Sequence, residues 1–155
     1  MKEDTLTMKR ILWILTAIGL GLVAGAVLLG AEGEGKSEEE VAKKASAESA
    51  QSWLALVDAG EYAKSWSAAA ELFQKQVSAD RWAETVRGVR GELGKLGSRK
   101  ATTSDYSRTL PGAPDGEYVI QQYASTFENK KEAMEHVVLM NEKDGTWKVV
   151  GYFIK

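Results

Sequence analysis

The sequence predicts an α+β domain in which three helices precede a four-stranded antiparallel sheet. Residues 37–98 carry apolar side chains at helical spacing, whereas residues 99–155 are richer in β-branched and aromatic residues. Because the expected strands follow one another through short links, they should form an antiparallel meander with the helices packed on one face. Both prolines of the chain lie in the turn LPGAPDG at residues 110–116, between the first two strands.

Length, charge and cysteine content limit the classes of protein and site. The chain has 155 residues, a net charge of −2 and no cysteine. It can therefore form no disulfide, thiolate zinc site or cysteine nucleophile. The charge is not typical of a basic nucleic-acid-binding protein, and an apolar share of 44% favours a packed core over disorder. No metal-ligand spacing appears, so we expect neither a metal nor another cofactor.

Residues 1–30 have the pattern of a signal peptide or a membrane anchor. Lys9 and Arg10 precede a run from residue 11 to residue 31 that holds no charge. These 21 residues are long enough to cross a bilayer. Small residues at 24–26 offer a cleavage site that would leave a shorter, signal-like apolar stretch, so cleavage and anchoring both stay open. We expect an exported protein that is periplasmic, extracellular or anchored by one N-terminal transmembrane helix.

The rest of the chain divides into a spacer and one domain. Residues 31–36 (AEGEGK) are acidic and contain little to bury, so they should link the N-terminal segment to the fold. Residues 37–155 are enough for a single α+β domain with its own core. The start of the chain stays open between Met1 and Met8, because Met8 directly precedes the basic pair.

The first helix is expected between Ser37 and Gly60. Ser37 is a favourable N-cap, and Glu40 three residues later completes a capping box. Gly60 is a typical helix stop. Apolar residues at spacings i, i+3, i+4 and i+7 predict the buried face: Ala50, Trp53, Leu54 and Val57.

Two further helices are expected before the sheet. The second should bury one face, whose apolar residues are four, three and four positions apart: Tyr62, Trp66, Ala69 and Phe73. The third should begin after Ser78, an N-cap residue with Val77 and Trp82 at the hydrophobic-staple positions. Glycines that recur from residue 88 to residue 97 should weaken the C-terminal end of this helix.

The C-terminal part predicts four strands and their pairing. The strands are expected at Arg99–Thr109, Glu117–Glu128, Ala133–Glu142 and Thr146–Lys155. Asp144-Gly145 is a strong two-residue hairpin signal, and it places His136 opposite Phe153. A second hairpin at Asn129-Lys130 places Tyr123 opposite His136.

Alternation along the strands then assigns the two faces of the sheet. The bulkier and less charged face should meet the helices, and it carries Met134, His136, Val138, Met140, Trp147, Val149, Gly151 and Phe153. Glu135 should lie on the other face, among Val137, Leu139, Val150, Tyr152 and Ile154. An exposed apolar patch of this kind often marks an interface, so the pattern predicts a homodimer through it.

Polar side chains among aromatic ones suggest a small ligand pocket under the helices. The candidate ligand-binding residues are His136, Tyr123, Gln121, Ser125, Trp147 and Phe153. A lone histidine on an apolar face is more often a hydrogen-bonded core residue, with a pKa lowered from about 6.5 by burial. We assign no catalytic residue.

Several segments resemble a known family. They include WLALVDAGEYAKSW at 53–66, SRTLPGAPDGEY at 107–118 and DGTWKVVGYFIK at 144–155. On these segments, residues 53–155 resemble the uncharacterised bacterial family named domain of unknown function 4019. The resemblance implies an exported bacterial protein, and its order of helices and strands is similar to the cystatin-like cone of the nuclear-transport-factor-two-like superfamily. It implies no activity.

The expected function is that of a non-catalytic binding or protein-interaction module of the cell envelope. Its partner would be a small ligand or an envelope protein, not a nucleic acid, with membrane contact through the N-terminal segment if that segment is uncleaved. The alternative is a small pocket enzyme, isomerase- or hydratase-like, with His136 and Tyr123 as its acid–base pair.

Overall fold

The structure, a computed structural model, describes residues 32–155 and confirms the predicted α+β class. In this part of the chain, four helices come first: α2 (Glu32–Asp58), α3 (Tyr62–Ala68), α4 (Glu71–Gln76) and α5 (Ala79–Leu93). Four strands follow: β1 (Leu96–Ser107), β2 (Tyr118–Phe127), β3 (Lys130–Asn141) and β4 (Trp147–Ile154). The strands form one antiparallel sheet in the order β1-β2-β3-β4, which is the predicted meander.

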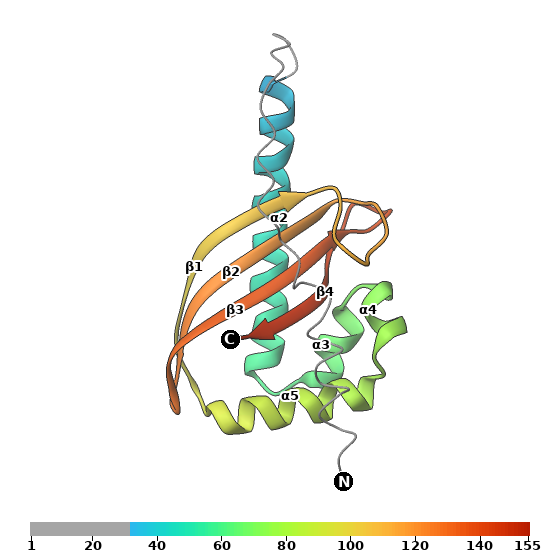
Figure 1. The fold of residues 1–155 in the computed structure, drawn as a ribbon. Helices are drawn as coiled ribbons and strands as arrows, with labels where there is room; N and C mark the ends of the chain where they lie inside the picture. Colours follow the sequence, from blue (N-terminus) through green and yellow to red (C-terminus); the bar gives the residue numbers. More distant parts are fainter. Residues whose placement is uncertain (1–31) are drawn as a thin grey trace.

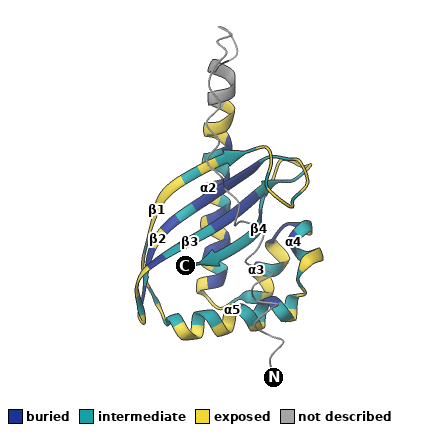
Figure 2. Cartoon of the chain, in the orientation of Figure 1, coloured by how far each residue is buried: buried dark blue, intermediate teal, exposed yellow. Residues whose placement is uncertain are grey.

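The core lies between one face of the sheet and the helices. In Figure 1, α2 runs behind the curved sheet and contacts all four strands, α3 and α4 lie beside β4, and α5 runs below the sheet toward the start of β1. Buried residues concentrate on α2 and the central strands (Figure 2). The predicted stripe of α2 is buried, with Ala50, Trp53, Leu54 and Val57 each at most 4% exposed. They pack against sheet residues that include Val119, Tyr123, Val137, Leu139 and Val149.

Two helix boundaries differ from the prediction. α2 begins at Glu32, so Ser37 is not its N-cap, and most of the predicted spacer is helical. No proline interrupts the chain there, so the helix can continue through these residues. The second predicted helix is divided by extended backbone at Ala69 and Ala70. The Ala70 N–H donates to the Val149 carbonyl of β4 at 2.9 Å, which replaces a bond within a helix.

α5 begins and ends where its sequence predicts. The Ser78 hydroxyl accepts a hydrogen bond from the Arg81 N–H at 3.3 Å, the expected N-cap contact. The helix ends at Leu93, within the weak glycine-rich stretch, and Gly94 follows with a positive φ of 75°. That conformation is readily available only to glycine.

The register of the sheet is only partly as predicted. His136 lies opposite Phe153, but a bulge shifts the pairing by one residue, so that Leu139 lies opposite Val149. The β2–β3 turn leaves Phe127 opposite Lys130, and after a further shift Tyr123 lies opposite Glu135. The predicted turn at Asn129-Lys130 is therefore wrong by one residue, and a shift of one residue turns a whole strand over.

The predicted face of β3 is wrong, because the bulge in the β3–β4 pairing places Leu139 and not Met140 on the same face as Val149. Val137 and Leu139 are fully buried against the helices, together with Glu135. On β4, Trp147 and Val149 face the helices as predicted, but beyond the bulge Tyr152 does so in place of Phe153. The apolar patch predicted to support a homodimer is thus largely part of the core.

No helix in residues 32–155 combines the length and the hydrophobicity that a membrane-spanning segment needs. The predicted signal or anchor segment, its cleavage site and the choice between Met1 and Met8 fall outside the described residues.

Alanine at Gly91, inside α5, and at Gly94, which follows it, should change the free energy of unfolding in opposite directions. Gly94→Ala is expected to lower the free energy of unfolding by about 1–3 kcal/mol, since φ is positive and the new Cβ would lie 2.8 Å from the Glu128 Cβ. Gly91 lies inside the helix, where an added Cβ would meet no other part of residues 32–155 within 4 Å. Gly91→Ala should therefore raise the stability by about 1 kcal/mol. Urea unfolding measures both, and a loss at both positions would contradict this explanation.

Candidate functional site

The structure does not bring the six predicted site residues together. Four lie buried on the helix-facing side of the sheet: Gln121, Tyr123, Ser125 and Trp147. The other two, His136 and Phe153, lie on the opposite face. The predicted common pocket is therefore wrong, because the register places Glu135 and not His136 beside Tyr123.

His136 is half-buried on the face away from α2. Its ring centroid lies 6.2 Å from that of Phe153. Burial, and then the positive charge of Lys155, lower the pKa of His136. The pKa is predicted to fall, but the prediction places His136 under the helices and not on this face. Because Tyr123 points to the opposite face, the two residues cannot form the acid–base pair that the alternative enzyme requires.

A fully buried carboxylate, Glu135, lies at the centre of the polar contacts inside the domain. It accepts hydrogen bonds from the Ser125 hydroxyl at 2.6 Å and from the Tyr152 hydroxyl at 2.6 Å. The guanidinium of Arg99 donates to its two oxygens at 2.8 and 3.0 Å. Both carboxylate oxygens are thus occupied by donors of the protein itself.

Arg99 extends these contacts to the helices. It donates to both oxygens of Asp58, at 2.6 and 3.0 Å, and Arg90 donates to the same carboxylate at 2.8 Å. Burial disfavours the charged guanidinium, but the hydrogen bonds to Asp58 and Glu135 outweigh it and hold the pKa of Arg99 above its usual value. We name Asp58, Arg90, Arg99 and Glu135 the ionic cluster.

The phenols beside the ionic cluster are poor candidates for proton transfer. Burial, and then the negative charge of Glu135, raise the pKa of Tyr152 well above its usual value. Burial is also the main cause of the raised pKa of Tyr123. Both groups therefore stay protonated near neutral pH, and the geometry indicates a structural role for the cluster.

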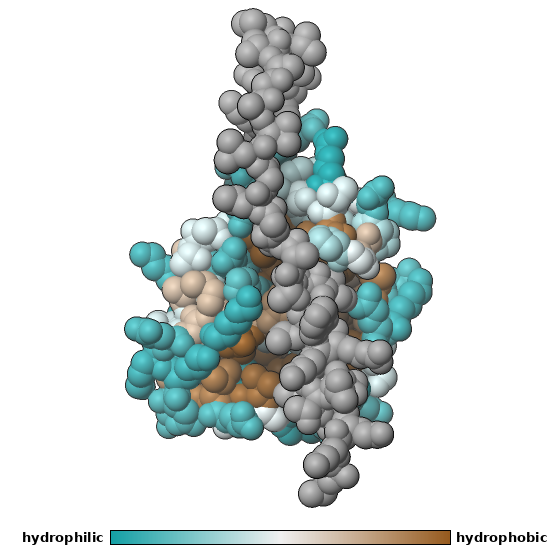
Figure 3. Space-filling view, in the orientation of Figure 1, coloured by the Kyte–Doolittle hydropathy of each residue, from teal (hydrophilic) through white to brown (hydrophobic). Residues whose placement is uncertain are grey.

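An apolar groove beside β4 is the more open candidate site. Two adjoining cavities of about 390 and 230 Å³ form it, and we name the pair the β4 groove. The residues common to both cavities are Phe73, Val77, Trp82, Tyr152 and Phe153. The larger cavity has the size of a small-molecule site. On the face shown in Figure 3, apolar surface gathers over the sheet with hydrophilic side chains around it.

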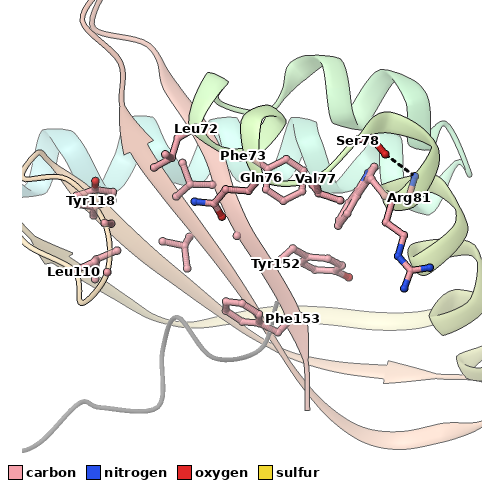
Figure 4. A pocket seen from close by; sticks show the side chains of 16 residues that line it. Leu72, Phe73, Gln76, Val77, Ser78, Arg81, Leu110, Tyr118, Tyr152 and Phe153 are labelled. Atoms are coloured by element: carbon pink, nitrogen blue, oxygen red, sulfur yellow. Dashed lines mark hydrogen bonds between the residues drawn. The ribbon is translucent and has the colours of Figure 1, made fainter. Parts of the chain in front are cut away.

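Four parts of the chain build the groove: α4, α5, β4 and the 110–113 turn. In Figure 4, Leu72 and Phe73 of α4 face Tyr152 and Phe153 of β4, and Arg81 lies at one end. The 110–113 turn adds a further wall beside Tyr118, whose hydroxyl donates to the Pro114 carbonyl at 2.6 Å. The turn and the Val77–Trp82 staple are both visible in the sequence. Their proximity is not, because it depends on tertiary contacts such as the bond from Ala70 to Val149 of β4.

Loss of the charge on Glu135 should strongly destabilise the domain. Glu135→Gln leaves Arg99 without the charge of its fully buried partner, and we expect a loss of about 3–5 kcal/mol in the free energy of unfolding. Glu71→Gln, which removes an exposed i,i+4 pair with Lys75, should change it by less than about 0.5 kcal/mol. Equal effects in urea unfolding would show that the ionic cluster is not a stabilising contact.

Comparison with known proteins gives one finding. Neither a curated protein nor a solved structure matches the chain. A family model described as "Protein of unknown function (DUF4019)" matches residues 49–152. The matched part extends from the second half of α2 into β4, and it includes the ionic cluster and most of the β4 groove. Because the family model matches more than half of its length, the chain belongs to the DUF4019 family.

Proposed function

We propose that this protein is an exported domain of the bacterial cell envelope that binds a ligand in the β4 groove without catalysing a reaction. The observation that supports this most is the groove itself. Its larger cavity of about 390 Å³ is lined mainly by apolar and aromatic side chains, with a few polar groups at its border such as Gln76 and Arg81. That combination is typical of binding sites.

A binding role fits the chemistry of the groove better than a catalytic one. Among the described residues that line its two cavities, the charged ones are Arg81 and Arg90. An acid–base mechanism needs a proton acceptor within reach of the substrate. The carboxylate of Glu135 is fully buried and bonded to protein donors, and it lines neither cavity.

Export is supported by the sequence of the N-terminal segment. Basic residues before a long uncharged run are typical of signals and anchors. A cystatin-like cone, as the family resemblance implied, is compatible with a long helix packed on a curved sheet. That likeness assigns no activity, because one fold serves many functions.

Export predicts that alkaline phosphatase fused after Lys36 is active outside the cytoplasm. The expected control is Leu20→Arg, which places a charge in the uncharged run and should abolish that activity. An inactive fusion of the unaltered chain, with the protein recovered from the cytosol, would contradict the proposal.

Binding in the groove can be tested with a small apolar probe. Toluene added to the full-length protein should shift the NMR signals of Leu72, Leu110 and Val138, which line the larger cavity and not the smaller one. Val150→Trp fills the larger cavity and should abolish these shifts, whereas Lys148→Trp on the same strand lies outside the groove and should keep them. Shifts that survive in Val150→Trp, or that never occur, would contradict a binding site here.

A further inference from the structure

β4 presents an open edge to the groove. It is the last strand of the sheet, and the Val149 carbonyl on its outer side accepts the hydrogen bond from Ala70. At the C-terminal end, Lys155 and Met134 bond to each other in both directions at 2.9 Å. Residues of an antiparallel pair alternate between bonding to the partner and pointing away from it.

This alternation identifies the free main-chain groups. Because Lys155 bonds to β3, Phe153 does so as well, and Tyr152 and Ile154 direct their N–H and C=O groups to the open edge. Within residues 32–155, no main-chain partner reaches these two residues from that side. Both residues also line the smaller cavity of the groove.

Free main-chain groups beside an apolar wall limit what can fill the groove. The wall opposite β4 includes Trp82, Val86 and Val89 of α5. An acyl chain or an aromatic ligand could occupy the cavities, but it would remove the edge groups from water without bonding to them, which is unfavourable. An extended peptide could fill the cavities with side chains and bond to the edge with its own main chain.

We infer that the β4 groove binds an extended peptide segment of a partner protein, which adds to the sheet as a strand beside β4. This inference rests on the proposed binding function and names its ligand class. Side chains of a strand alternate in direction, so every second residue of the segment should be apolar and enter one of the two cavities.

Charge adds a second requirement on the partner. One terminal nitrogen of Arg90 already donates to the carboxylate of Asp58 at 2.8 Å. Arg81 pairs with Glu84, but that carboxylate is 72% exposed and the contact is 3.2 Å long, so the guanidinium can accept a second anionic partner. The segment should therefore carry an aspartate or glutamate at the end that lies beside Arg81.

The same requirement disfavours two other occupants. A second copy of β4 with the residue that follows it contributes Lys148 and Lys155 and no acidic residue, so it would add positive charge beside Arg81. The run at residues 11–31 of this chain holds no charge. A partner segment with an acidic residue complements the groove better than either.

Selection from a displayed library of random 12-residue peptides on the full-length protein tests the inference. Enriched peptides should have apolar residues at alternate positions and an acidic residue near one end. Synthetic peptides from this set should bind Ile154→Pro about tenfold more weakly, because proline removes an edge N–H while the pairing with β3 is kept. Ile154→Val keeps that N–H and should bind within about twofold, as one fewer methylene changes little.

A second pair of variants tests the charge. Arg81→Gln should weaken binding of the acidic peptides about tenfold, and Arg81→Lys should retain most of it. Methylation of alternate peptide nitrogens should abolish binding, whereas methylation of the intervening ones should not.

Three results would overturn the inference. They are a selection without enrichment, equal binding to Ile154→Pro and the unaltered protein, and a dimer in sedimentation that Ile154→Pro dissociates, since a second copy would then occupy the edge. If toluene still shifts the groove signals in Ile154→Pro, only the peptide inference fails. If those shifts are absent from the unaltered protein as well, the proposed binding function fails.

Discussion

Arg99 lies between two carboxylates, Asp58 at the end of α2 and Glu135 in the middle of β3, and the placement of the helices on the sheet depends on these contacts. A carboxylate as buried as Glu135 is tolerated only with full hydrogen bonding, which Arg99, Ser125 and Tyr152 supply. Once Glu135 faces inward, alternation turns Val137 inward too and His136 outward.

The bulge in the β3–β4 pairing connects this cluster to the groove. Before the bulge, Val149 faces the core; after it, Tyr152 does, and its hydroxyl reaches Glu135. Without the extra residue, Phe153 would point at the helices and the phenol would point away. The bulge therefore completes the hydrogen bonding of Glu135 and, in the same step, places Tyr152 and Phe153 on the border of the groove.

Local features of this fold could be predicted from sequence, whereas the site could not. The Ser78 cap and the buried stripe of α2 depend on residues a few positions apart, and both are confirmed. The face of β3 was predicted wrongly, because Glu135 resembles a surface residue until its partner Arg99, 36 positions earlier, is known. The strand order follows from short links, but the bulge at Val138/Leu139, which no local sequence signal marks, shifts the β3–β4 pairing by one residue, so the residues that share a face on these two strands could not be matched correctly.

The walls of the groove are held in place by contacts with one another and with the core behind them. The Trp82 indole donates to the Ser65 hydroxyl at 2.9 Å, and its ring lies edge-on to Phe73 at 5.0 Å between centroids. The Tyr152 ring packs edge-on against Trp53 at 5.3 Å while its hydroxyl is bonded to Glu135. Side chains fixed in this way lose little freedom when a ligand binds, so the cost of ordering falls mainly on the ligand. A segment that already favours an extended conformation would therefore bind better than a flexible one of the same composition.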